Sequence, residues 1–151
     1  MIEIKDGFYL KDIKPNEINN IDWKDGIIQL NDGCVDLVVT DPPYGMKFVS
    51  NHRKEKHKAI LDDDNLDWVK EWVESLKRVC KPDAHLYIFI SFHNVDFFKI
   101  ELSKQFNVKN ILIWEKNNTG MGDLEGDYAP KYEMIIFCSN GTKKLNGRRD
   151  S

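Results

Sequence analysis

The chain has 151 residues, of which 41% are hydrophobic and 31% are charged, and its formal net charge is −3. This length and balance are typical of one globular domain and exclude a disordered chain, and no apolar run approaches the roughly 20 residues that cross a bilayer. The three cysteines are widely spaced within or beside apolar segments. We therefore expect buried, reduced thiols in a cytoplasmic protein, without a metal site.

The first third of the chain predicts a hairpin, a loop and one buried strand. Alternating residues flank Asp6-Gly7, which is a hairpin signal, and a polar loop completes the N-terminal region, residues 1–20. The apolar run VDLVVT at residues 35–40 predicts a strand that ends directly in the turn DPPYG. Residues 46–58 show no apolar periodicity, so we expect a long exposed loop there.

The rest of the chain alternates between helical and strand patterns. Apolar residues at three- and four-residue spacing predict a helix that is capped by Asp64 or Asn65 and stopped by Pro82. A second amphipathic helix is expected over residues 94–106, with Asn94 as its cap. Continuous apolar runs predict three further strands, at residues 85–91, 109–115 and 132–138.

This alternation predicts a single α/β domain over residues 1–151, ending in a basic tail at residues 140–151. The sheet should be mostly parallel and buried on both faces, because continuous apolar strands alternate with amphipathic helices. Strand 132–138 follows a Gly-rich loop rather than a helix, so we expect it to be one antiparallel strand. Ligands bind at the carboxyl ends of strands in such folds, which would bring three segments to one rim. These segments are 41–58, 91–94 and 116–130.

The turn after residues 35–40 combines groups that suit an amine. Its two prolines fix φ and carry no N–H, so their carbonyls are held in a defined direction. Asp41 adds a carboxylate acceptor, and Tyr44 offers a flat ring for stacking. A carboxylate and a fixed carbonyl can accept both hydrogens of one –NH₂ group while the ring stacks on the base that carries it. The pattern indicates an exocyclic amine of a nucleobase that has been taken out of the helical stack.

These residues also resemble a known family. Asp41-Pro42-Pro43-Tyr44 is similar to the catalytic motif of the AdoMet-dependent amino-methyltransferases of DNA. Asp at the first position resembles the N6-adenine branch, whereas the N4-cytosine branch more often has Ser. The similarity extends over residues 20–149 and looks like phage and prophage methylases. It implies a Rossmann-like sheet and a site-specific enzyme that transfers a methyl group from S-adenosylmethionine (AdoMet) to N6 of adenine in DNA.

The resemblance also assigns roles to individual residues. It implies that residues 41–44 are catalytic, and that Asp25 and Gly26 bind the cofactor together with Asp41 and Pro42. The lone pair of the adenine amine is delocalised into the ring. Accepting the amine hydrogens at Asp41 and at the Pro42 carbonyl would localise electron density on the nitrogen as it attacks the methyl group.

DNA contact is expected from the loop after the turn, which carries several cations beside a single acid. Phosphate contacts of this kind give affinity without sequence information. The residues expected to bind DNA there are Lys47, Phe48, Arg53, Lys54 and Lys56.

A glycine loop of the F-x-G-x-G type, which binds AdoMet in the resembled family, does not occur in residues 1–151. In enzymes that carry the D-P-P-Y motif first, that loop lies far downstream. We therefore expect a catalytic half that binds AdoMet poorly alone, and an incomplete sheet whose edge is available to a second polypeptide or a second copy. Three alternatives stay open: an N4-cytosine methyltransferase, an inactive remnant that binds DNA or a partner, and, with Asp41 against it, an RNA or protein-amide methyltransferase.

Overall fold

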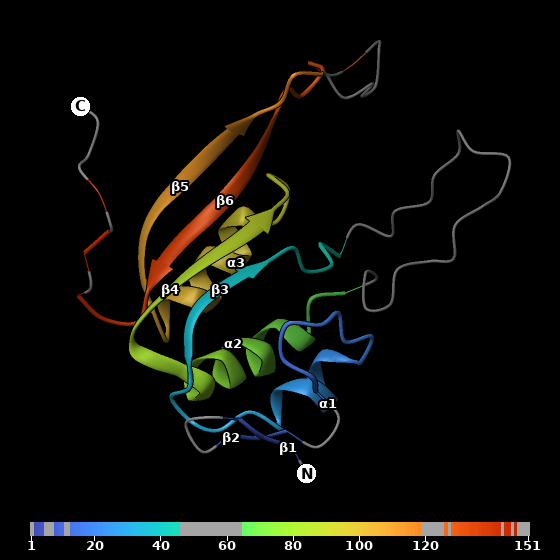
Figure 1. Cartoon of the computed structure of the whole chain (residues 1–151). Helices are drawn as coiled ribbons and strands as arrows, with labels where there is room; N and C mark the ends of the chain where they lie inside the picture. The colour runs from blue at the N-terminus through green and yellow to red at the C-terminus, as the bar shows by residue number, and fades with distance from the viewer. Residues whose placement is uncertain are drawn as a thin grey trace, which may run out of the picture.

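The computed structural model describes residues 13–45, 65–118 and 128–142, the backbone of two short strands near the N-terminus, and residues 126, 144, 145 and 147. Those two strands, β1 (Ile2–Ile4) and β2 (Phe8–Leu10), pair in antiparallel fashion, as the hairpin pattern predicts. Figure 1 shows them at the foot of the molecule, apart from the main sheet.

The main sheet contains β3 (Val35–Thr40), β4 (Cys80–Ile90), β5 (Asn107–Glu115) and β6 (Tyr132–Ser139), in the order β3-β4-β6-β5 (Figure 1). β3 and β4 are parallel, whereas β6 is antiparallel to both of its neighbours. β6 is thus the one reversed strand, as expected. Because β6 lies between β4 and β5 and runs antiparallel to both, two of the three pairings are antiparallel, and the prediction of a mostly parallel sheet is wrong.

Three helices accompany the sheet: α1 (Trp23–Ile27), α2 (Trp68–Val79) and α3 (Val95–Ser103). α2 begins after Asp67 rather than after the predicted cap, and the side chain of Asn65 instead accepts a bond from the Asp67 N–H at 3.0 Å. The helix ends at Val79, before Pro82, and β4 begins at the next residue without an intervening loop. The pairing of β3 with β4 is irregular before His85, and Pro82 lies in that stretch, where a missing N–H is tolerated.

The hydrophobic core lies between the sheet and the two longer helices. α2 and α3 pack on one face, where Leu86 and Ile88 of β4 are fully buried against side chains such as Val73 and Phe98. Rings join the two helices, since Trp68 meets Phe98 edge-on with centroids 6.1 Å apart. Burying each large side chain contributes about 1.5–3 kcal/mol, so this layer holds the fold together.

The opposite face of the sheet is only partly buried among the described residues, contrary to the expectation from its apolar strands: Phe137 of β6 is buried there, but β3 is not. Leu37 is 55% exposed and Val39 is 62% exposed, both on β3. The cause lies in the topology, because the described helices that follow β3 and β4 both pack on the same side. Among the described residues, no helix has the length and apolar character needed to span a membrane.

Candidate active site

The turn after β3 is anchored in the core at one side and open at the other. Pro42 is buried and Tyr44 packs partly against the core cluster, while Asp41 is exposed. Gly45 then lets the chain turn away with φ of 71°, in the left-handed region. This φ favours glycine, and a Cβ there would lie 2.9 Å from Cδ2 of Leu66. The turn is therefore rigid, with its carboxylate facing outward.

Tyr44 and Asp41 are joined within the turn, since the Tyr44 hydroxyl donates a hydrogen bond to Oδ1 of Asp41. Burial raises the pKa of Tyr44 above its usual value, and the bond to the Asp41 carboxylate raises this pKa further. The phenol is consequently held in its neutral, donating form. In this state it occupies Oδ1 of Asp41.

Asn94 fixes the turn from the next strand connection. It lies after β4 at the start of α3, where the sequence predicts a helix cap, but its side chain makes no capping bond. Instead, its Nδ2 donates to the backbone carbonyl of Tyr44 at 2.5 Å. No local sequence pattern predicts this role, because the bond joins residues that are 50 positions apart. Asn94 thereby ties the end of β4 to the end of β3.

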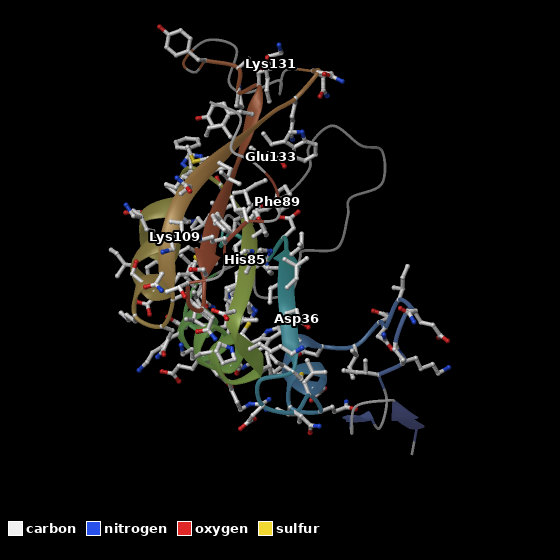
Figure 2. The ribbon with its side chains drawn as sticks, turned by 60° about the vertical axis from the view of Figure 1, so that its left-hand side comes forward. Asp36, His85, Phe89, Lys109, Lys131 and Glu133 are labelled. Atoms are coloured by element: carbon white, nitrogen blue, oxygen red, sulfur yellow. The ribbon has the colours of Figure 1, made fainter. Side chains whose placement is uncertain are left out.

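A cavity of about 350 Å³ opens beside Tyr44 at the carboxyl ends of β3, β4 and β5 and the start of β6. Described parts of all three predicted rim segments line it, which agrees with the rule that loops at strand ends meet. Lys116 and Glu133 form an ion pair in its wall. Figure 2 shows Glu133 toward this end of the sheet and Asp36 toward the other. The lining residues include Tyr44, Ser91, Phe92, His93, Lys116, Pro130, Tyr132 and Glu133.

The cavity wall contains aromatic residues besides Tyr44, two of them in the predicted rim segment 91–94. Phe92 and His93 lie together with ring centroids 3.8 Å apart, and Tyr132 lies at the start of β6. Their position directly beyond strand ends is the signal that could have identified them. With Tyr44 they give the cavity flat surfaces of the kind that hold a planar base.

The predicted cofactor residues Asp25 and Gly26 do not join this cavity. Both lie in α1, where Gly26 is buried and the Asp25 carbonyl accepts a bond from Gln29 Nε2 at 2.8 Å. α1 packs on α2 through Trp23 and Trp68, whose rings are 6.3 Å apart. The contacts of Asp25 and Gly26 are therefore those of a small structural helix.

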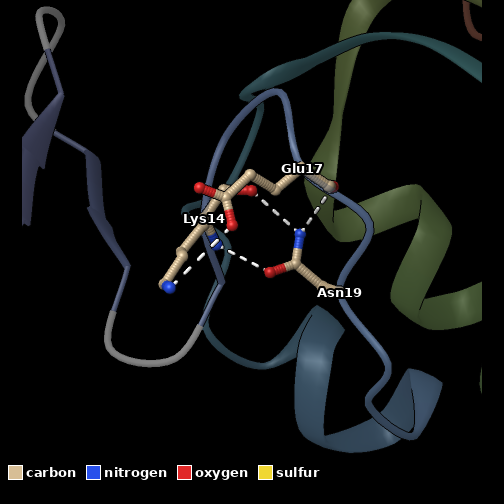
Figure 3. Close-up of polar contacts among 3 residues, drawn as sticks. All are labelled: Lys14, Glu17 and Asn19. Atoms are coloured by element: carbon tan, nitrogen blue, oxygen red, sulfur yellow. Dashed lines mark hydrogen bonds and ion pairs between the residues drawn. The ribbon is translucent and has the colours of Figure 1, made fainter.

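The loop before α1 is fixed by its own polar contacts (Figure 3). The Asn19 side chain accepts from the Lys14 N–H at 2.8 Å and donates to the carbonyls of Lys14 at 2.9 Å and Glu17 at 3.0 Å. The Lys14 and Glu17 side chains add an exposed ion pair at 3.8 Å. The predicted DNA-binding residues lie outside the described residues: Lys47, Phe48, Arg53, Lys54 and Lys56.

The cysteines are not placed for nucleophilic chemistry. Burial raises the pKa of Cys80 to about 11 and that of Cys138 to about 12, so both remain thiols near neutral pH. Cys34 is half-buried with a raised pKa and lies before β3, away from the cavity lining. Within the described part of the chain, no cluster of three or more His, Cys, Asp or Glu side chains is arranged to hold a metal ion.

Comparisons with known proteins agree with the motif. A family model described as DNA methylase, for N6 and N4 enzymes, matches residues 35–149. The chain is 26% identical to DNA adenine methyltransferase YhdJ of Escherichia coli over 90% of this chain and 46% of that protein. It is 30% identical to Type II methyltransferase M.HpaI of Haemophilus parainfluenzae over 80% of this chain and 38% of that protein. The chain thus spans less than half the length of these curated relatives.

Solved structures show the same fold at low sequence identity. The M1.HpyAVI–SAM complex matches with a TM-score of 0.57 and 21% identity, covering 85% of this chain and 56% of that one. The cytosine-N4-specific PvuII DNA methyltransferase matches with a TM-score of 0.51 and 11% identity, covering 76% of this chain and 45% of that one. At these identities the similarity concerns the fold alone. One of the enzymes that share this fold is described as specific for N4 of cytosine.

Proposed function

The chain belongs to the N6/N4 DNA methylase family, and we propose that it is the catalytic half of a site-specific enzyme that methylates the N6 amine of adenine in DNA. The observation that carries this proposal is the Asp41–Tyr44 turn, in which Tyr44 lines an aromatic cavity and is hydrogen-bonded to Asp41. The chain spans less than half the length of these curated relatives, so the activity of a whole enzyme is proposed here rather than observed.

In the proposed mechanism the turn holds the amine of an extruded adenine. The Asp41 carboxylate accepts one amine hydrogen and the Pro42 carbonyl accepts the other, so electron density gathers on the nitrogen that attacks. To bind, the amine displaces the Tyr44 hydroxyl from Asp41, which frees the Tyr44 ring to stack on the base. No covalent intermediate with the protein is needed, which agrees with the unreactive cysteines. The turn contributes orientation and the removal of water.

The described residues form only one side of a site for AdoMet. Asp41 and Pro42 follow the end of β3 and reach the cavity through Tyr44, which lines it, whereas Asp25 and Gly26 lie in α1; none of these four residues lines the cavity itself. Its volume of about 350 Å³ lies within the roughly 300–1,000 Å³ of small-molecule pockets. AdoMet supplies the methyl group when bound. The remaining walls of its site would come from another part of the enzyme.

Adenine is favoured over cytosine by the first residue of the motif. Asp41 resembles the N6-adenine branch, and the E. coli relative that aligns with 90% of this chain is named an adenine methyltransferase. The fold does not discriminate, since it is shared with a cytosine-N4-specific enzyme. The proposed DNA contacts are those of the basic loop that contains Lys47, Phe48, Arg53, Lys54 and Lys56, which would bind phosphates beside the turn.

Analysis of the methylated base tests this function. The chain is co-expressed with the part of M.HpaI that its alignment leaves unmatched, in a host that lacks DNA methylases, and the DNA is digested to nucleosides for mass spectrometry. We expect N6-methyladenine. N4-methylcytosine would contradict the choice of base. A complex that binds DNA and leaves both bases unmodified would contradict the proposed enzymatic activity. It would favour the alternative of an inactive remnant that binds DNA.

A further inference from the structure

An ion pair lies in the wall of the candidate active site. Lys116 directly follows β5, Glu133 is the second residue of β6, and both side chains belong to the lining of the cavity. Each of the two side chains is 35% exposed, so the pair is partly withdrawn from water. The Lys116 N–H also donates to the Lys131 carbonyl at 2.8 Å. The ammonium of Lys116 is therefore held at the cavity wall both through its backbone and through its charged partner.

This ion pair lies within electrostatic reach of the turn that would hold the amine. Burial and the bond to Asp41 raise the pKa of Tyr44, and the negative charge of Glu133 adds to the same effect. Tyr44, Lys116 and Glu133 also line one cavity. A base that stacks on Tyr44 within this cavity would therefore have the ion pair beside the edge of its ring.

Lys116 differs from the other polar side chains of the lining in what it can bind. A lysine ammonium carries three N–H donors and no acceptor, whereas Ser, Asn, Tyr and neutral His can both donate and accept. Among the described residues that line the cavity, Lys116 is the one whose side chain can only donate. The bond to Glu133 uses one of its donors, which leaves N–H groups for an acceptor on a ligand.

An extruded adenine presents acceptors on both sides of its amine. Ring nitrogen N1 flanks the amine on one side and N7 flanks it on the other, and each carries a lone pair. In the proposed mechanism the amine hydrogens go to Asp41 and to the Pro42 carbonyl, so the ring nitrogens are the polar groups of this edge that still need a partner. An acceptor that leaves water without finding a donor costs affinity. A side chain in the wall that can only donate meets this need.

We propose that Lys116 is a base-binding residue that donates a hydrogen bond to a ring nitrogen beside the amine of the extruded adenine, while Glu133 holds the ammonium in place and balances its charge. The inference rests on the proposed capture of an extruded adenine, but not on methyl transfer. Lys116 should hold the base rather than speed the transfer, because a cation at a ring nitrogen withdraws electrons from the amine. The negative charge of Glu133 limits that withdrawal.

A contact with a DNA phosphate is the competing role for this ammonium. Such contacts come from cations whose charge is available to neutralise the phosphate, whereas the charge of Lys116 is already balanced by Glu133. Lys131 offers a matched comparison, because it pairs with Glu115 at 2.9 Å across the same two strands, with side chains 51% and 75% exposed. Lys131 is not among the residues that line the cavity. Figure 2 shows Lys131 beyond Glu133 at the same end of the sheet.

Titration of the 151-residue chain with nucleosides, followed by NMR, tests the assignment without relying on catalysis. The probes are adenosine, 1-deazaadenosine and 7-deazaadenosine; the two analogues keep the amine but lack N1 or N7. We expect adenosine to shift the ring signals of Tyr44 and Phe92, and one analogue to bind about 10-fold more weakly, because a bond from a charged donor is lost. Lys116→Met should weaken adenosine binding by the same factor and abolish the difference between adenosine and that analogue. Lys131→Met should change neither quantity, and Glu133→Gln, which keeps an acceptor for Lys116, should retain the difference. Amide spectra of each variant show whether the fold is retained.

Three results would overturn the inference. One is equal binding of adenosine and both analogues, since no ring nitrogen would then have a donor. Another is a difference between them that persists in Lys116→Met, which would leave a phosphate contact as the role of this ammonium. The third is adenosine that shifts neither ring signal, since the cavity would then hold no base. Lys116-dependent binding of adenosine by a chain whose assembled enzyme leaves DNA unmethylated would instead contradict the proposed activity while leaving the base-binding residue supported.

Discussion

Two aspartates mark the two ends of β3, and they differ in everything except residue type and exposure. Asp36, near the start of the strand, pairs with Lys81 at 2.7 Å on an exposed surface. Asp41 directly follows the strand and accepts a bond from Tyr44, which lines the cavity. Both residues are exposed. Exposure alone therefore does not distinguish Asp41 from Asp36. The turn that holds Asp41, and the contacts of that turn, make Asp41 the candidate catalytic residue.

The largest expected effect comes from removing the carboxylate of Asp41. Asp41→Ala should reduce methyl transfer by the assembled enzyme about 10²–10³-fold or more, because one of the two fixed acceptors for the amine is lost. Single-turnover incorporation of tritiated methyl groups into DNA measures the effect. Transfer within a few-fold of the unmodified enzyme would contradict the role of the turn.

Tyr44 should matter less than Asp41, and through its ring rather than its hydroxyl. Tyr44→Ala should cost about 1–3 kcal/mol of base capture, since stacking on the extruded base is lost. Tyr44→Phe should retain most of the transfer, because the amine displaces the hydroxyl from Asp41 in any case. DNA titrations followed by fluorescence of 2-aminopurine at the target position separate the two variants. Equal losses in both would mean that the hydroxyl carries the function.

Asn94 should act as a positioning residue, because its side chain holds the Tyr44 carbonyl and thus the turn in place. Asn94→Asp replaces the Nδ2 donor by an acceptor that faces the Tyr44 carbonyl, whereas Asn94→Ala only removes the bond. We expect both to slow transfer, with the Asp variant worse, and the Ala variant to cost about 1–3 kcal/mol of stability because a part-buried carbonyl loses its donor. Thermal unfolding and the rate of transfer at saturating DNA are measured together. A stability loss with an unchanged rate would reduce Asn94 to a structural contact.

The smallest effect is expected at the other end of β3. Asp36→Ala removes an ion pair whose side chains are 43% and 62% exposed, and such pairs contribute about 0–1 kcal/mol. Methyl transfer should be unchanged, which makes this variant the matched control for Asp41→Ala. Urea denaturation and the same transfer assay check both statements. If Asp36→Ala abolished transfer, the contrast between the two aspartates would fail.

Local features of the chain could be predicted from the sequence, and features that join distant segments could not. The strand 35–40 and its turn are visible because hydrophobic periodicity and the two prolines act over a few residues. The insertion of β6 beside β4 depends on a return path that no local pattern records. The same limit applies to Asn94, whose partner is the Tyr44 carbonyl from the connection after β3.

Apolar strands also led to a wrong expectation about burial. A continuous apolar run such as residues 35–40 indicates that both faces of the strand favour burial against other apolar groups. It does not indicate whether the same chain supplies that contact, and here Val39 remains largely exposed. The cofactor residues Asp25 and Gly26 came from the resemblance alone, and the structure places them in α1 without a contact that tests that role.

Calorimetric titration of AdoMet into the isolated chain tests most directly whether it carries the amine-holding side of a two-part site. None of the four residues expected to bind the cofactor lines the cavity of about 350 Å³ beside Tyr44. We predict little or no heat of binding for the chain alone, and binding once the complementary half of a methyltransferase is added. One-to-one binding at micromolar affinity by a monomeric chain would contradict the account, because the cofactor site would then be complete within these 151 residues.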